Sequence, residues 1–210
     1  MTTAQQPQHE SKAKILDAAL RVIRTKGYAA TTVDDLCAAA GVTKGAFFHH
    51  FKSKEDLAVA AADHWSEMTG NLFAQAPYHR HADPLDRVIG YIDFRKSLLT
   101  GELPEFTCLV GTMVQETYDS NPAIRDACAH SITSHAAKVE ADIREAIAKY
   151  RISPPWTAAS LALYTQAVLQ GAFIIAKAKD NPKDAAACVD HLRRYVEQLF
   201  NRPQKKEKAR

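Results

Sequence analysis

Three capped prolines divide this chain into helical segments. Asp83-Pro84, Asn121-Pro122 and Asn181-Pro182 each place a hydrogen-bond-accepting side chain directly before a proline. Proline fits the first turn of a helix because the backbone N–H that it lacks has no partner there. Between these points apolar residues recur at three- and four-residue intervals, and no stretch alternates apolar with polar residues as a strand would. The chain is therefore expected to be an all-α protein.

The helix signals predict a small N-terminal module followed by a larger helical body. Nine helices are expected, over residues 10–26, 32–40, 43–50, 54–75, 84–100, 104–118, 122–149, 155–179 and 182–201. The first three are short and joined by tight turns, whereas those from residue 122 onward are long. We therefore expect one domain over residues 9–53, a second over 54–201, and a basic, disordered tail over 202–210.

Composition excludes several classes of protein. The chain is 46% hydrophobic, enough for a core, and its net charge is only +3, so bulk charge gives no evidence for a nucleic-acid partner. Residues 1–9 are polar, and the longest apolar run, over 167–178, is interrupted by Gln170 and Lys177, so neither export nor a membrane span is expected. The four cysteines are far apart, which predicts reduced cytoplasmic thiols rather than a zinc or disulfide framework.

Residues 31–51 have the pattern of a helix-turn-helix. Thr32 and Asp35 have the spacing of a capping box, and Gly41 begins a turn in which Thr43 can cap the next helix. Phe47 and Phe51 are four apart and should pack inward, which leaves Phe48 and His49 facing outward. The second helix of such a motif can enter the major groove of DNA.

Three strings in this region resemble the DNA-binding signature of the tetracycline-repressor (TetR) family. They are Thr31-Thr32-Val33, Ala40-Gly41-Val42-Thr43-Lys44-Gly45 and Phe48-His49-His50-Phe51-Lys52-Ser53-Lys54-Glu55-Asp56-Leu57. The resemblance implies a three-helix DNA-binding domain followed by a helical ligand-binding and dimerisation domain. It also implies a cytoplasmic transcription regulator, by default a repressor, that binds a palindromic operator as a homodimer and is released by a small hydrophobic or reactive effector.

The same resemblance implies which residues meet double-stranded DNA. The expected contacts to phosphate or base edges are Thr32, Thr43, Lys44, Gly45, Phe48, His49, His50 and Lys54. Thr32 and Lys54 match phosphate contacts of the family, and Thr43 to Gly45 match its base-reading turn. The family usually has tyrosine where this chain has Phe48, so this chain lacks the hydroxyl that commonly bonds a phosphate there.

Past residue 60 the resemblance is faint, and the effector pocket is predicted from apolar faces together with the family's architecture. The candidates are Trp65, Met68, Phe94, Leu98, Cys108, Met113 and Tyr164, with Gln115 and Gln166 as polar groups. The alternative is that these faces are ordinary core. The segment 106–116 also resembles that of an electrophile-sensing subgroup in which the matching cysteine reacts, whereas a buried, inert thiol is the plainer interpretation of Cys108.

The last two expected helices have apolar seams that predict a dimer interface. The candidates are Leu161, Val168, Gly171, Ile175, Val189, Leu192, Val196 and Leu199. Burial within one chain could also explain either seam. No metal or cofactor is expected, because His79 and His81 lack helical ligand spacing, and no enzyme is expected because common catalytic fingerprints are missing. The alternative to a regulator is a helical ligand carrier or scaffold without DNA binding.

Overall fold

The computed structural model describes residues 5–201, with side chains from Glu10 onward, and confirms the all-α prediction. Within this range there are ten α-helices and one 3₁₀ helix, and no strand. The predicted disorder of residues 202–210 concerns a segment outside the described residues. The described residues form two compact units. The first comprises the described part of Met1–Asn71 together with Thr107–Ile132, and the second comprises Leu72–Phe106 together with the described part of Thr133–Arg210.

The first unit is built around α1 (Gln5–Lys26), which packs against α2 (Val33–Ala40), α3 (Lys44–His50) and α7 (Leu109–Thr117). Its buried core includes Ile15, Ala19, Ile23, Leu36, Phe47, Phe51, Leu57, Leu109, Met113, Ile124 and Cys128. The predicted domains, residues 9–53 and 54–201, are continuous stretches of sequence, whereas the two compact units are groups of segments that contact one another. This grouping places α7 and the first turns of α8 (Pro122–Tyr150) in the same unit as the helix-turn-helix.

Local capping sets the geometry of the helix-turn-helix. Thr32 caps α2 in a reciprocal capping box with Asp35, and Gly41 ends the helix in the left-handed conformation at φ 64°. The Thr43 hydroxyl then accepts a hydrogen bond from the N–H of Ala46, 3.2 Å away, at the start of α3. These are the caps that the sequence predicts, because each depends on residues at most three positions apart.

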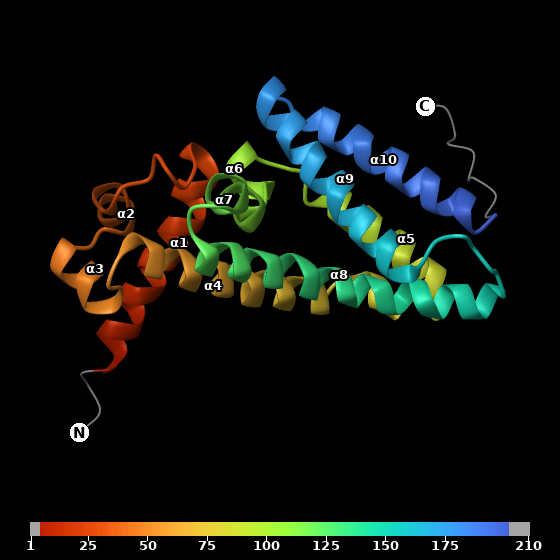
Figure 1. The fold of residues 1–210 in the computed structure, drawn as a ribbon, viewed down its shortest axis with the longest axis horizontal. Helices are drawn as coiled ribbons and strands as arrows, with labels where there is room; N and C mark the ends of the chain where they lie inside the picture. Colours follow the sequence, from red (N-terminus) through yellow and green to blue (C-terminus); the bar gives the residue numbers. More distant parts are fainter. Residues whose placement is uncertain (1–4, 202–210) are drawn as a thin grey trace. The chain divides into compact units, whose positions relative to one another are not determined.

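The second unit contains η1 (Pro77–Arg80), α5 (Pro84–Ser97), α6 (Leu103–Phe106), α9 (Ala158–Lys179) and α10 (Pro182–Leu199). Helices α5, α9 and α10 lie side by side (Figure 1). Both α4 (Lys54–Ala74) and α8 contribute one end to each unit. The predicted caps form here too: Asp83 accepts from Leu85 N at 2.8 Å and Asn181 from Lys183 N at 3.0 Å.

One predicted helix, over residues 104–118, is in fact two. The chain is helical in α6, extended at Cys108 (φ −85°, ψ 122°), and helical again from Leu109. The Cys108 sulfur acts as the cap of α7, because it accepts from Gly111 N at 3.4 Å. Cysteine is not among the usual capping residues, so no local signal indicates this break.

Candidate nucleic-acid interface and internal cavity

Helix α3 presents a distinct outer face. Phe47 and Phe51 are 0% and 3% exposed and anchor the helix in the core, whereas Phe48 is 54% exposed. Thr43, Lys44, Gly45 and His49 are exposed as well, and His50 is half-buried with its Nε2 2.6 Å from Ser11 Oγ. The structure therefore places six of the eight predicted DNA contacts on one outward-facing helix and its cap, while the contacts themselves stay a prediction.

Lys44 forms an exposed ion pair with Asp34. Its Nζ lies 2.8 Å from Asp34 Oδ1, and both side chains are largely exposed. The hydrogen bond to Asp34, with the attraction of that carboxylate next, raises the pKa of Lys44. Exposed ion pairs of this kind contribute little free energy, so Lys44 can exchange Asp34 for a phosphate at small cost.

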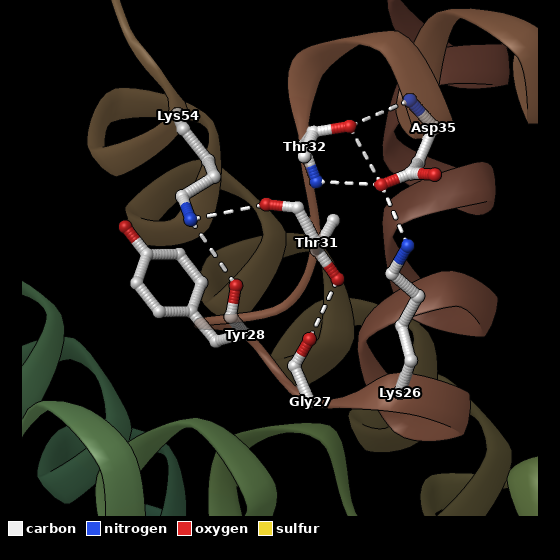
Figure 2. Close-up of polar contacts among 7 residues, drawn as sticks. All are labelled: Lys26, Gly27, Tyr28, Thr31, Thr32, Asp35 and Lys54. Carbon is white, nitrogen blue, oxygen red and sulfur yellow. Dashed lines mark hydrogen bonds and ion pairs between the residues drawn. The ribbon is translucent and has the colours of Figure 1, made fainter.

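Lys54 has a different setting from the one predicted. Its Nζ donates to the backbone carbonyls of Tyr28, at 3.2 Å, and Thr31, at 3.0 Å, and lies 4.4 Å from the centre of the Tyr28 ring (Figure 2). Two of the three donors of the ammonium are therefore used within the protein. Lys54 thus holds the loop between α1 and α2, and its phosphate contact stays a prediction.

Thr32 is also engaged internally. Its hydroxyl accepts from Asp35 N at 3.1 Å and donates to Asp35 Oδ2 at 2.6 Å, and its backbone N–H donates to the same oxygen at 2.8 Å (Figure 2). Lys26 Nζ lies 2.7 Å from that oxygen. The Lys26 hydrogen bond first, and those of Thr32 next, hold the pKa of Asp35 well below its usual range. A phosphate at Thr32 would thus compete with a fully ionised carboxylate.

The carboxylate of Glu116 in α7 also binds the loop between α1 and α2. Its carboxylate accepts from Tyr28 N at 3.2 Å and from Ala29 N at 2.6 Å. Gly27 adopts φ 88°, and a Cβ at this position would lie 2.6 Å from Glu116 Oε1, so the glycine makes room for the carboxylate. Sequence reasoning missed this contact, because the partners are 87 and 88 positions apart and no local pattern connects them.

The second unit contains a cavity of about 280 Å³. It is lined by Phe73, Ala74, Tyr78, His79, Val88, Tyr91, His135, Lys138, Val139 and Asp142. None of the nine predicted pocket residues is among them. These residues were chosen because they form apolar stripes on predicted helices. Such a stripe indicates that a helix face is buried, but it does not show whether that face lines a cavity or packs against another side chain.

The predicted pocket residues are dispersed between the two units. In the first unit Trp65, Cys108 and Met113 pack at the core, while Met68 and Gln115 are exposed. In the second unit Tyr164 is 44% exposed and Phe94 and Leu98 are half-buried. Two of the nine adjoin the cavity: the Gln166 side chain is bonded to Tyr91, and the Phe94 ring lies 5.5 Å from the Phe73 ring and 6.0 Å from the Tyr78 ring, and these three partners line it. The assignment of these nine residues to an effector pocket stays a prediction.

A chain of hydrogen bonds crosses the wall of this cavity. Gln166 Nε2 donates to Tyr91 Oη at 2.9 Å, and Tyr91 Oη lies 3.1 Å from His135 Nε2. Burial, with the positive charges of Arg95 and Lys138 next, lowers the pKa of His135 to about 3. The imidazole is therefore neutral at physiological pH.

Cys108 is half-buried and serves as the cap of α7, while Cys128 is fully buried in the same core. Burial, with Cys108 next, raises the pKa of Cys128 to about 12, so this second thiol is held as an inert thiol. The reactivity of Cys108 stays a prediction. No group of three or more His, Cys, Asp or Glu side chains suited to a metal ion occurs among the residues that the structure describes.

Part of the predicted dimer seam lies inside the chain. Leu161, Val189, Leu192 and Val196 are at most 4% exposed, because α9 and α10 pack on each other and α10 packs on α5. These four residues belong to the intrachain core, and their part in a dimer interface stays a prediction. Ile175 is 42% exposed, and Val168, Gly171 and Leu199 are half-buried.

The exposed side of α9 is itself apolar. It carries Leu163, Tyr164, Ala167, Val168, Gly171, Ile174, Ile175 and Ala178. Helix α9 is thus apolar on all sides, which explains why it alone among the described helices has the length and mean hydropathy of a membrane span, with 44% of that window buried. Helices that are apolar on all sides are normally covered on all sides.

A helix-turn-helix with an outward second helix, joined to a helical unit that holds a cavity, defines the class of two-part helical DNA-binding regulators. Comparison with known proteins agrees. A family model described as bacterial regulatory proteins, tetR family, matches residues 15–61, and a model described as tetracyclin repressor-like, C-terminal domain, matches residues 84–192. The chain belongs to the tetracycline-repressor family, which is regulatory rather than enzymatic.

Individual relatives support the assignment. A TetR transcriptional regulator from Chloroflexus aurantiacus is 28% identical with a TM-score of 0.81, and the alignment covers 92% of this chain and 98% of that one. The regulator TtgR of Pseudomonas putida is 37% identical over 76 residues, 36% of each chain. The regulator YerO of Bacillus subtilis is 40% identical over 63 residues, 30% of this chain and 22% of YerO. The chain therefore spans about a fifth to a third of the length of these two curated relatives.

Proposed function

We propose that this protein is a cytoplasmic, ligand-responsive transcription repressor and not an enzyme. A homodimer binds a palindromic operator through α3 of each protomer, and a small effector in the cavity of the second unit releases it. The observation that carries the proposal is the outer face of α3, where Thr43, Lys44 and Phe48 are exposed while Phe47 and Phe51 fix the helix to the core. The free N–H groups at such a helix start favour phosphate.

Dimerisation is supported by the uncovered apolar side of α9. A second copy packed on this side would bury Leu163, Ile174 and Ile175, which are 42% to 49% exposed. The Tyr164 and Tyr195 rings, 5.3 Å apart, extend the same surface onto α10. Two recognition helices held by such a dimer can read half-sites about one DNA turn, roughly 34 to 36 Å, apart.

The route from effector to DNA is supported by chain continuity. Both α4 and α8 supply residues to the cavity unit and to the unit that contains the helix-turn-helix. An effector that favours one packing of these helices therefore needs only about 1 to 3 kcal/mol of coupling to change operator affinity 5- to 150-fold.

The test is selection of duplexes from a randomised DNA library, followed by fluorescence anisotropy at several salt concentrations. We expect palindromic sequences to be enriched and the logarithm of the binding constant to fall steeply with the logarithm of salt, because neutralised phosphates release counterions. A ligand carrier or scaffold would enrich no sequence and show no such slope. That result would reject the proposal.

Gly45→Ala separates folding from DNA binding. A Cβ at this exposed helical position would meet only Thr43 Oγ1, 3.7 Å away, so alanine fits and should stabilise the protein by about 1 kcal/mol. If the duplex backbone approaches Gly45, the added methyl should still lower operator affinity, by roughly tenfold. Thermal melts and anisotropy measure the two effects. A variant with unchanged operator affinity would place Gly45 away from DNA.

Lys54→Met tests whether Lys54 positions the loop or contacts phosphate. Loss of its bonds to Tyr28 O and Thr31 O should lower the free energy of unfolding by about 1 kcal/mol and weaken operator binding. The salt slope should stay unchanged, because no phosphate contact is lost. A slope reduced by about 0.9 with unchanged stability would instead restore the phosphate role.

A further inference from the structure

We infer that the cavity of the second unit takes a flat aromatic molecule of one or two rings that carries an oxyanion, such as an aromatic carboxylate. The inference rests on the proposed function, since it names the effector class of that regulator. It depends on three features of the cavity: its aromatic walls, the hydrogen-bond donor that His135 presents, and the surplus of positive charge beside that donor.

The walls favour a flat, apolar ligand. Phe73, Tyr78 and Tyr91 line the cavity, and their rings contact one another, with the Phe73 and Tyr91 centres 5.8 Å apart and those of Tyr78 and Tyr91 5.9 Å apart. Val88 and Val139 complete the apolar surface. An apolar cavity of about 150 Å³ can hold benzene, so a volume of about 280 Å³ has room for two fused rings.

The hydrogen-bond chain favours one position for the proton of neutral His135. Tyr91 Oη accepts from Gln166, which leaves its own hydrogen to donate to His135 Nε2, and with Tyr91 as the donor of this pair Nε2 is the acceptor. A neutral ring with Nε2 as acceptor carries its hydrogen on Nδ1. Among the described residues Nδ1 has no hydrogen-bond partner. His135 therefore presents one N–H donor for which a ligand oxygen is the matching acceptor.

Charge around this donor favours an anion. Arg95 has its guanidinium carbon 5.2 Å from the centre of the Phe73 ring, and Lys138 lines the cavity itself. The one carboxylate in the lining, Asp142, is already bonded to Arg87 Nε at 2.6 Å, and Arg87 also pairs with Glu145. Arg87, Arg95 and Lys138 therefore carry three positive charges against the two negative charges of Asp142 and Glu145, a surplus of one positive charge, and an oxyanion hydrogen-bonded to His135 would be attracted by Arg95 and Lys138.

The experiment compares three naphthalene probes that share rings and differ in charge: 2-naphthoate, 2-acetonaphthone and 2-naphthylmethylammonium. Isothermal titration calorimetry of the full-length protein without DNA measures their affinities. We expect naphthoate to bind most tightly and at least tenfold more tightly than the ammonium probe. Equal affinities, preference for the ammonium, or no binding of any probe would overturn the inference.

Variants locate the site. His135→Phe keeps a ring but removes the donor, so naphthoate affinity should fall by about tenfold or more, as for a hydrogen bond to a charged group. Val139→Phe, which fills the cavity, should abolish binding of all three probes even if His135→Phe fails to fold. The control is His191→Gln on the exposed side of α10. Naphthoate binding unaffected by Val139→Phe would place the probe elsewhere and refute the site.

The same probe separates this inference from the proposed function. Selected operator DNA is bound first and 2-naphthoate is then added. Release of the DNA by naphthoate would support both the ligand class and the effector role of the cavity. Binding of naphthoate without release upholds the ligand class and contradicts the effector role of the cavity, whereas DNA binding without any probe binding upholds the regulator and refutes the ligand class.

Discussion

Replacing Glu116 with alanine should lower operator affinity by roughly 30-fold, although Glu116 belongs to α7 and not to the helix-turn-helix. The carboxylate is the acceptor for Tyr28 N and Ala29 N, and the loop that it holds leads directly into Thr32 at the start of α2. Two charge-assisted hydrogen bonds at a partly exposed site contribute about 2 kcal/mol, which corresponds to that change in affinity if the loop must be re-ordered on DNA.

Two variants make this measurement specific. Glu116→Gln retains an acceptor but no charge, so it should fall between wild type and Glu116→Ala. Gln115→Ala is the matched control, because Gln115 is the exposed neighbour whose side chain donates only within its own helix, to Gly111 O at 2.7 Å. Anisotropy with selected operator DNA gives the affinities, and hydrogen exchange at residues 27–31 reports the loop. If Glu116→Ala binds operator as wild type does, the loop is not set by α7.

The features that sequence reasoning predicted correctly are local. The caps at Thr32, Thr43, Asp83 and Asn181 each join residues two or three positions apart, and helical periodicity needs only a few turns to be seen. The outward face of α3 follows from the spacing of Phe47 and Phe51. All-α structure and the helix-turn-helix could therefore be predicted from one sequence.

The features that it missed depend on contacts across long stretches of chain. Glu116 meets residues 87 and 88 positions away, and Gln166 meets Tyr91 75 positions away. Lys54 was assigned to DNA by resemblance, but its nearest acceptors are carbonyls of the α1–α2 loop, which periodicity cannot place. His135 belongs to no sequence motif, because Tyr91 and Arg95, which help to set its protonation, lie on another helix.

The dimer seam shows why an apolar stripe is ambiguous. The stripe through Leu161, Leu192 and Val196 is regular, yet its members are buried by helices of their own chain. The informative signal was a different one. Helix α9 is apolar on the opposite side too, at Leu163, Ile174 and Ile175, and one chain has no element left to cover that side among its described residues. A helix with too many apolar residues for one core predicts a partner.

Ile175→Glu should therefore convert the dimer to a monomer and weaken operator binding by more than about 100-fold. The carboxylate would be buried against an apolar partner surface, where an unpaired charge is strongly unfavourable, and its symmetry mate would repel it. A monomer carries one recognition helix, so the gain of about 100-fold or more from binding two linked half-sites is lost. Sedimentation velocity and anisotropy measure the two effects together.

The control is Gln198→Glu, which adds the same charge at an exposed position of α10. It should remain dimeric and bind as wild type does, because Gln198 is not among the apolar residues of the proposed interface. A monomeric Ile175→Glu that still binds a half-site duplex would show that α3 is intact and that only the pairing of two copies was removed. An Ile175→Glu variant that stays dimeric would instead place the interface away from α9, and the exposed apolar side would need another partner.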